Sequence, residues 1–214
     1  MYPEAISDSL WKLLRRLNRI SDMKFCYLAG GTALALQLAH RRSDDLDFFV
    51  TEEFDDLSFS RKIQLEGLDT LVVNQSPHHM ELMIQSIKVD LVRERIPLRF
   101  PLKSICPRTE KLRMADPRDI GRMKIISIAS RGSKKDFVDL YCLTREIITL
   151  ESLIVTAMEE DRGVKYSKLL FLKGLVDFEE AARESDLNMI WDIGWEEVKR
   201  SLIEEVRKIA KKIQ

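Results

Sequence analysis

The 214-residue chain is long enough for one domain with a helical extension or for two small domains. With 45% apolar and 33% charged residues it has the balance of a globular protein, and no run approaches the ~20 apolar residues that span a membrane. Cys26, Cys106 and Cys142 are too few and too dispersed for a disulfide framework or a zinc ribbon, and the N-terminus shows no secretory signal. We therefore predict a reducing, cytoplasmic setting.

Charge is distributed unevenly although the net charge is zero, which argues against a general nucleic-acid binder. Residues 93–135 carry 13 basic and 4 acidic side chains, whereas residues 1–92 carry 10 basic and 14 acidic ones. The basic middle indicates either a local site for polyanions or charges scattered over a solvated surface.

Short strands and helices alternate in the first half of the chain. An amphipathic helix is predicted over residues 4–21, and a helix that is apolar nearly all round, and hence buried, over 32–40. The other elements predicted there are strands over 25–29, 46–50, 70–73, 81–84 and 87–92, a helix over 57–66, a turn over 76–79 and an extended connector marked by Pro97, Pro101 and Pro107.

The second half reads as helical. Asp116 with Pro117 is a helix start, and that helix should end at Arg131 before Gly132. The further helices are predicted over 134–146, 150–162, 167–184 and 196–213. The resulting fold class is α+β, with a mixed β-sheet flanked by helices over residues 1–110 and a helical region over 111–214.

A glycine pair lies between the first predicted strand and the buried helix. Without Cβ atoms, Gly30 and Gly31 let the backbone approach a ligand closely, and the exposed N–H groups of a helix start favour phosphate. Thr32 adds a hydroxyl at the same place. Such turns also serve as plain connections, so this feature by itself is a weak signal.

Three carboxylates strengthen the signal. Asp45 and Asp47 are two residues apart on a strand and should share one face, where a divalent cation such as Mg²⁺ or Mn²⁺ would relieve their repulsion. Asp90 lies opposite the core-facing Val89 and Leu91, where a neighbouring strand could present the other two carboxylates. Three carboxylates can hold two metal ions for phosphoryl or nucleotidyl transfer, although Asp90 alone reads as one charge in an alternating strand.

The order of these parts resembles the DNA polymerase β-like nucleotidyltransferase superfamily. The Gly-Gly-Thr-Ala-Leu run at 30–34, followed by Arg41, Ser43 and the Asp-x-Asp-Phe-Phe run at 45–49, is similar to the AbiEii/AbiGii toxin family of abortive-infection and type IV toxin–antitoxin systems. The similarity continues to about residue 145. Residues 150–214 carry no motif that we can assign.

This resemblance implies roles for residues of the second half. Lys124 is expected to contact the NTP triphosphate, with Arg131 on the same helix stripe, and Asp136 is expected to help shape the site. Ser43 joins the NTP-binding set in the same way. From the residues alone, the stripe is equally consistent with a solvated helix face, and Ser133 with Asp136 resembles a capping box.

The resemblance implies a metal-dependent nucleotidyltransferase that moves a nucleoside monophosphate from an NTP to an acceptor, with RNA such as tRNA as the expected acceptor and a cognate antitoxin as a partner. Arg93, Arg95 and Arg99 could guide such an acceptor through phosphate contacts. The alternatives are transfer to a small molecule and a module that binds NTP or a partner without turnover. We interpret His78 and His79 as exposed turn residues.

Overall fold

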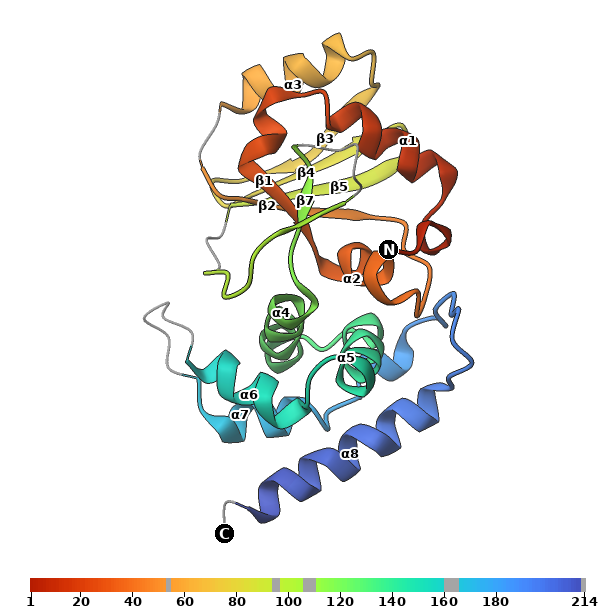
Figure 1. The fold of residues 1–214 in the computed structure, drawn as a ribbon, viewed down its shortest axis with the longest axis vertical. Helices are drawn as coiled ribbons and strands as arrows, with labels where there is room; N and C mark the ends of the chain where they lie inside the picture. Colours follow the sequence, from red (N-terminus) through yellow and green to blue (C-terminus); the bar gives the residue numbers. More distant parts are fainter. Residues whose placement is uncertain (53–54, 94–96, 106–110, 160–165, 213–214) are drawn as a thin grey trace. The chain divides into compact units, whose positions relative to one another are not determined.

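The computed structural model describes all residues except 53–54, 94–96, 106–110, 160–165 and 213–214 (Figure 1). The chain divides into two compact units, residues 1–116 and 117–214. The division falls a few residues beyond the predicted boundary at 110 because Arg113–Met114 still forms a strand of the sheet. No helix in the described residues is long and apolar enough to cross a membrane.

The first unit is built on one mixed sheet. Within the described residues it has seven strands in the order β3-β4-β5-β2-β1-β7-β6. Strand β2 runs parallel to β5 and β1 runs parallel to β7, and the other neighbours are antiparallel. The strands are β1 (Cys26–Ala29), β2 (Leu46–Val50), β3 (Thr70–Gln75), β4 (His79–Ile84), β5 (Ile87–Val92), β6 (Lys103–Ser104) and β7 (Arg113–Met114).

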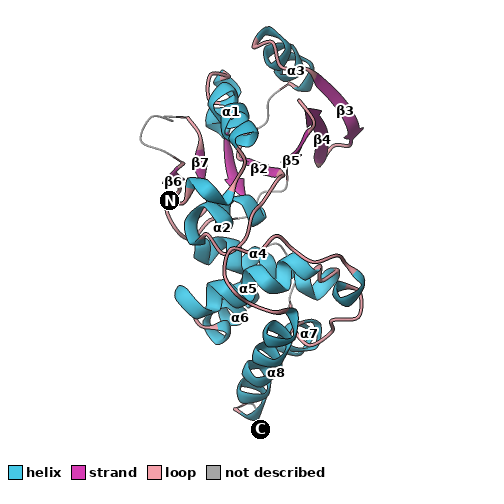
Figure 2. Cartoon of the chain, turned by 90° about the vertical axis from the view of Figure 1, so that its right-hand side faces the viewer, coloured by secondary structure: helices cyan, strands magenta, loops and turns pink. Residues whose placement is uncertain are grey.

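One face of this sheet forms the core of the unit. Leu46, Phe48, Leu82 and Leu91 are all fully buried, in keeping with the two-residue alternation of β2, β4 and β5. Figures 1 and 2 show two helices together on one side of the strands, α1 (Asp8–Leu17) and α3 (Asp56–Leu65). The opposite face of the central strands carries Asp47 and Asp90 together with the stacked rings of Tyr27 and Phe49.

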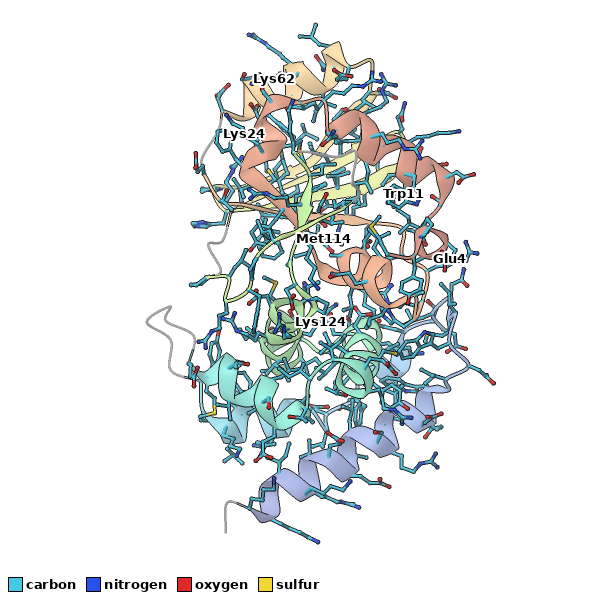
Figure 3. The ribbon with its side chains drawn as sticks, viewed as in Figure 1. Glu4, Trp11, Lys24, Lys62, Met114 and Lys124 are labelled. Carbon is cyan, nitrogen blue, oxygen red and sulfur yellow. The ribbon has the colours of Figure 1, made fainter. Side chains whose placement is uncertain are left out.

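Hydrogen bonds hold both α1 and α3 in place. The Ser7 hydroxyl accepts from the backbone N–H of Leu10 at 3.2 Å and caps α1. Lys62 of α3, labelled in Figure 3, donates to both carboxylate oxygens of Asp22, at 2.7 and 2.9 Å. Asp22 lies in a short 3₁₀ turn, η2 (Ser21–Phe25). The structure thus replaces the single helix predicted over 4–21 with a 3₁₀ turn, η1 (Pro3–Ala5), followed by α1 and then by η2.

Helix α2 (Gly30–Leu38) is buried on nearly every side, as its sequence predicts. Its residues are apolar almost throughout, so burial is favourable all round. It ends at Ala39, which adopts the left-handed conformation with φ +53°. The helix contacts both β1 and β2, and this contact places its first turn beside the ends of two central strands.

The second unit is helical. Its described elements are α4 (Pro117–Ser130), α5 (Lys134–Glu146), α6 (Leu150–Met158), α7 (Lys168–Gly174), a 3₁₀ turn η3 (Ala181–Arg183) and α8 (Trp195–Lys211). The predicted single helix over 167–184 is wrong, because α7 stops at Gly174. A Cβ at Gly174 would lie 3.0 Å from the Cα of Ala129, so α7 and α4 approach more closely there than a larger residue allows.

An aromatic cluster fixes the start of α8. The ring of Trp195 lies 6.0 Å from that of Phe137 and 5.8 Å from that of Phe178, both with edge-to-face geometry. Trp195 is therefore a packing anchor at the start of α8.

Candidate active site

The turn between β1 and α2 depends on a glycine. Gly30 has φ +64°, a conformation that other residues adopt only with strain. A Cβ at this position would overlap Asp47 Oδ2 and lie 3.0 Å from Asp47 Cγ. The turn that opens α2 therefore lies directly against a carboxylate of β2.

The hydroxyls of Thr32 and Ser43 are buried beneath this turn. Thr32 Oγ1 lies 2.8 Å from Ser43 Oγ and donates to the backbone carbonyl of Asp45. Ser43 Oγ in turn donates to Asp45 Oδ1 at 3.4 Å. With 0% and 3% exposure, the two residues hold the segment that leads into β2, and their contact with an NTP stays a prediction.

Two of the three predicted carboxylates meet on neighbouring strands. Asp47 of β2 and Asp90 of β5 are register partners in a parallel pair, so their side chains project from the same face of the sheet. That face is opposite the core-facing Leu46 and Phe48. Asp45 precedes β2 by one residue and lies two residues before Asp47, which keeps it on this side.

Asp90 contacts His79 and Lys88, two residues for which the sequence predicted no role in the site. His79 Nε2 lies 2.7 Å from Asp90 Oδ1, and the Lys88 amine lies 3.2 Å from Oδ2 and 3.6 Å from an oxygen of Glu81. The interpretation of His79 as an exposed turn residue is wrong, because His79 opens β4 and its side chain is only 34% exposed. His78 is exposed, as expected.

The charges around Lys88 show how acidic this face is. Partial burial lowers the pKa of the Lys88 amine, but the hydrogen bond to Asp90 and the charges of Asp90, Glu81 and Asp45 outweigh it and raise that pKa above its ordinary value. A positive charge at this place is therefore stabilised by three carboxylates.

The two-residue turn between β4 and β5 explains why these side chains converge. Gln85 and Ser86 both have positive φ, the geometry of a tight hairpin, and they pair Ile84 with Ile87. The same register sets Glu81 opposite Asp90. The alternation of Lys88 with Asp90 and a two-residue turn could have indicated both neighbours from the sequence.

The donor set suits a magnesium ion that is shared with a substrate. Among the described residues, no group of three His, Cys, Asp or Glu side chains forms a ready-made metal cage. Magnesium is commonly bound by one or two carboxylates together with substrate phosphates, so such a cage is not required. Asp45 and Asp47 beside the glycine turn have the chemistry for this arrangement, with Asp90 adjacent to them in the sheet.

In the second unit, Lys124 is buried among acidic partners. It projects from α4 (Figure 3), and its amine lies 2.7 Å from Asp136 Oδ1 and 2.7 Å from Asp139 Oδ2, both on α5. Burial tends to raise the pKa of Asp136, but the Lys124 charge and hydrogen bonds from Lys124 and Ser133 lower it below its ordinary value. Asp139, fully buried at 0% exposure, lies about one turn beyond Asp136 on the same helix.

The predicted capping box at the start of α5 does not form in its usual way. Ser133 occupies the N-cap position, but its hydroxyl donates to Asp136 Oδ2 at 2.6 Å and makes no cap to the backbone. Asp136 thus binds the lysine and the serine at once. Arg131 is exposed at the end of α4 and lines a cavity of about 280 Å³ with Gly132, Gly174 and Arg183. An NTP contact of Lys124 or Arg131 stays a prediction.

Basic residues follow Asp90 along the chain. Arg93 is half-buried and its backbone N–H donates to the carbonyl of His78 at 2.8 Å, whereas Arg99 is exposed. Arg95 lies outside the described residues. Lys103 of β6 pairs with Asp116 at 3.1 Å.

This combination of a mixed sheet, a glycine turn and carboxylates on neighbouring strands is a nucleotidyltransferase fold. MenT4, a nucleotidyltransferase toxin of Mycobacterium tuberculosis H37Rv, shares it with a TM-score of 0.53 and 16% sequence identity, over 89% of this chain and 82% of MenT4. The model of the AbiEii nucleotidyltransferase toxins of type IV toxin–antitoxin systems matches residues 12–213, and the chain belongs to this family.

Two further proteins show similarity. An uncharacterised protein of Aquifex aeolicus (strain VF5) is 36% identical over 201 residues, which cover 88% of this chain and 93% of the relative. The Megavirus polyadenylate synthase matches 70% of this chain and 32% of its own at 12% identity, with a TM-score of 0.43. The family match confirms the predicted family and the nucleotidyltransferase activity, and the MenT4 structure confirms the fold class.

Proposed function

We propose that this nucleotidyltransferase moves a nucleoside monophosphate from an NTP to RNA such as tRNA, with Mg²⁺ or Mn²⁺ held by Asp45 and Asp47 and with Asp90 completing a second metal site. The observation that carries the proposal is the placement of Asp47 against Gly30 on one side and in register with Asp90 on the other. When bound, the metal neutralises phosphate charge and orients the reacting oxygens.

Other residues of the first unit bind the phosphates of the NTP and accept the proton of the acceptor. The backbone N–H groups at the Gly30–Gly31 turn face a phosphate at the start of α2. Asp90 accepts the proton of the acceptor hydroxyl as its oxygen bonds to the α-phosphorus. The bond from that phosphorus to the oxygen bridging the β-phosphate breaks, and pyrophosphate leaves.

The second unit enters the proposal through the family motif. That motif implies NTP phosphate contacts for Lys124 and Arg131; of the two, the exposed Arg131 keeps this role in the proposal, and Asp136 would shape the surroundings. The Lys124 amine already forms ion pairs with Asp136 and Asp139, and these two carboxylates neutralise the positive charge that would attract a phosphate. We assign its main role to orienting the α4–α5 pair, with Asp136 as its fixed partner.

The basic stretch that follows Asp90 in the sequence favours RNA as the acceptor. Residues 93–135 carry 13 basic and 4 acidic side chains. Arg122, Lys124 and Lys134 of this stretch are buried, but exposed members such as Arg99, Arg131 and Lys135 could contact phosphates and hold a polyanion without reading its sequence. Membership of a type IV toxin–antitoxin family also supports a cognate antitoxin as the regulatory partner.

The test is incubation of the full chain with labelled NTPs, Mg²⁺ and total tRNA. Label should enter RNA, and Asp45→Ala should reduce transfer by at least about 100-fold without loss of folding. Asp44→Ala is the matched control, since Asp44 is the exposed neighbour. NTP binding with no labelled RNA would refute the RNA acceptor, and an active Asp45→Ala variant would refute the metal assignment.

A further inference from the structure

His79 is held rigidly at the entry of β4. Its backbone N–H donates to the Ser76 hydroxyl at 3.1 Å, and its carbonyl accepts from the backbone N–H of Ser76 at 2.8 Å. The strand then pairs His79 with Val92 across the β4–β5 ladder. A diagonal neighbour in such a ladder lies within reach of a long side chain, and for His79 this neighbour is Asp90.

The contact between the two side chains is a directed hydrogen bond. Asp90 is 7% exposed, and its Oδ1 lies 2.7 Å from His79 Nε2. An ionised carboxylate can only accept, so the imidazole donates. A buried carboxylate held by a charge-assisted bond from a backbone-anchored ring has little freedom to rotate.

The other oxygen of Asp90 already meets a cation. The Lys88 amine lies 3.2 Å from Oδ2, and it also feels the charges of Glu81 and Asp45. The Lys88 side chain is 44% exposed and flexible, so water screens this ion pair and Lys88 can leave. His79 therefore fixes the carboxylate, whereas Lys88 shows that a positive charge reaches its second oxygen.

We propose that His79 is a positioning residue for Asp90. Its Nε2–H fixes Oδ1 so that Oδ2 is presented to the metal and to the acceptor hydroxyl. This inference rests on the proposed function, because it needs Asp90 to act at the same site as Asp45 and Asp47. Hydrogen-bond partners of ligating carboxylates commonly change metal affinity by about 10- to 100-fold when they are removed.

Two variants separate the hydrogen bond from the bulk of the ring. His79→Leu removes the donor, whereas His79→Gln keeps an N–H donor on a chain of similar reach. His78→Leu is the matched control, because His78 is the exposed neighbour on the same turn. Urea unfolding of each full-length variant verifies that the sheet is intact.

Two quantities are measured for each full-length variant. Electron paramagnetic resonance gives the affinity for Mn²⁺ with ATP present, and an activity assay gives the dependence of nucleotidyl transfer on Mn²⁺ concentration. We expect His79→Leu to weaken Mn²⁺ binding about 10- to 100-fold, His79→Gln to recover most of it and His78→Leu to leave it unchanged. Unchanged affinity in His79→Leu, equal loss in both His79 variants, or wild-type protein that binds no Mn²⁺ would overturn the inference. Normal Mn²⁺ binding by wild-type protein without transfer would instead refute the proposed function.

Discussion

Replacing Gly30 by alanine should disable the enzyme while leaving it folded. Gly30 has φ +64°, and a non-glycine residue in this conformation costs about 1–2 kcal/mol. The added Cβ would also lie 3.0 Å from Asp47 Cγ, where carbon atoms normally stay about 3.5–4.0 Å apart. The Asp47 carboxylate must therefore move by about 0.5–1 Å, a displacement that can cost on the order of 100-fold in rate.

Gly67→Ala is a control with the same backbone strain. Gly67 has φ +66°, but its added Cβ would meet only the flexible end of Arg16, at 3.3 Å. Urea unfolding should show a loss of about 1–2 kcal/mol in Gly67→Ala and at least as large a loss in Gly30→Ala, which adds the overlap with Asp47. Steady-state transfer from labelled NTP should fall about 100-fold only in Gly30→Ala. Equal activity of the two variants would refute the contact between the glycine turn and the Asp47 carboxylate.

Two further predictions concern the buried charges of the second unit. Lys124→Met leaves two buried aspartates without their cation, so urea unfolding should show a loss of about 3–5 kcal/mol, against little change for the exposed control Lys208→Met. A loss below about 1 kcal/mol would contradict the ion-pair geometry. Because the folded-state pKa of Asp136 is lowered, its stabilising contribution is complete above the unfolded pKa of about 3.9 and is lost as the pH falls through the folded value. The urea midpoint should therefore drop on acidification below about pH 4, and Asp136→Asn should flatten this drop.

Local pattern was enough to predict most elements of the first unit. The predicted strands over 46–50 and 87–92 have the observed bounds: buried and half-buried positions alternate through Leu46–Val50, and apolar and polar residues alternate from Ile87 to Leu91. Strand β6 lies within the predicted connector and β7 between that connector and the next predicted helix; neither was predicted, because segments of two residues carry no period of their own. Pairing with β1 on one side and with β6 on the other makes β7 a strand.

The long-range parts of the site could not be read from the sequence. The pairing of Asp47 with Asp90 depends on β5 returning beside β2, with the β3–β4 hairpin placed at the edge of the sheet. The burial of Lys124 could not be predicted for the same reason. The sequence places a lysine on a helix, but it does not reveal that α5 packs beside that helix and buries the amine against Asp139. Tertiary packing decides whether such a lysine meets solvent, substrate or an aspartate.

The parallel pairing of β2 with β5 also has a consequence during protein synthesis. Asp47 and Asp90 are 43 residues apart in the sequence, and β4, which supplies His79, lies between them. A nascent chain thus cannot assemble the carboxylate pair until Val92 has emerged from the ribosome and β5 has closed against β2. Non-local pairing of this kind forms late in folding. The growing polypeptide therefore cannot form the proposed site through at least the first 92 residues of its synthesis.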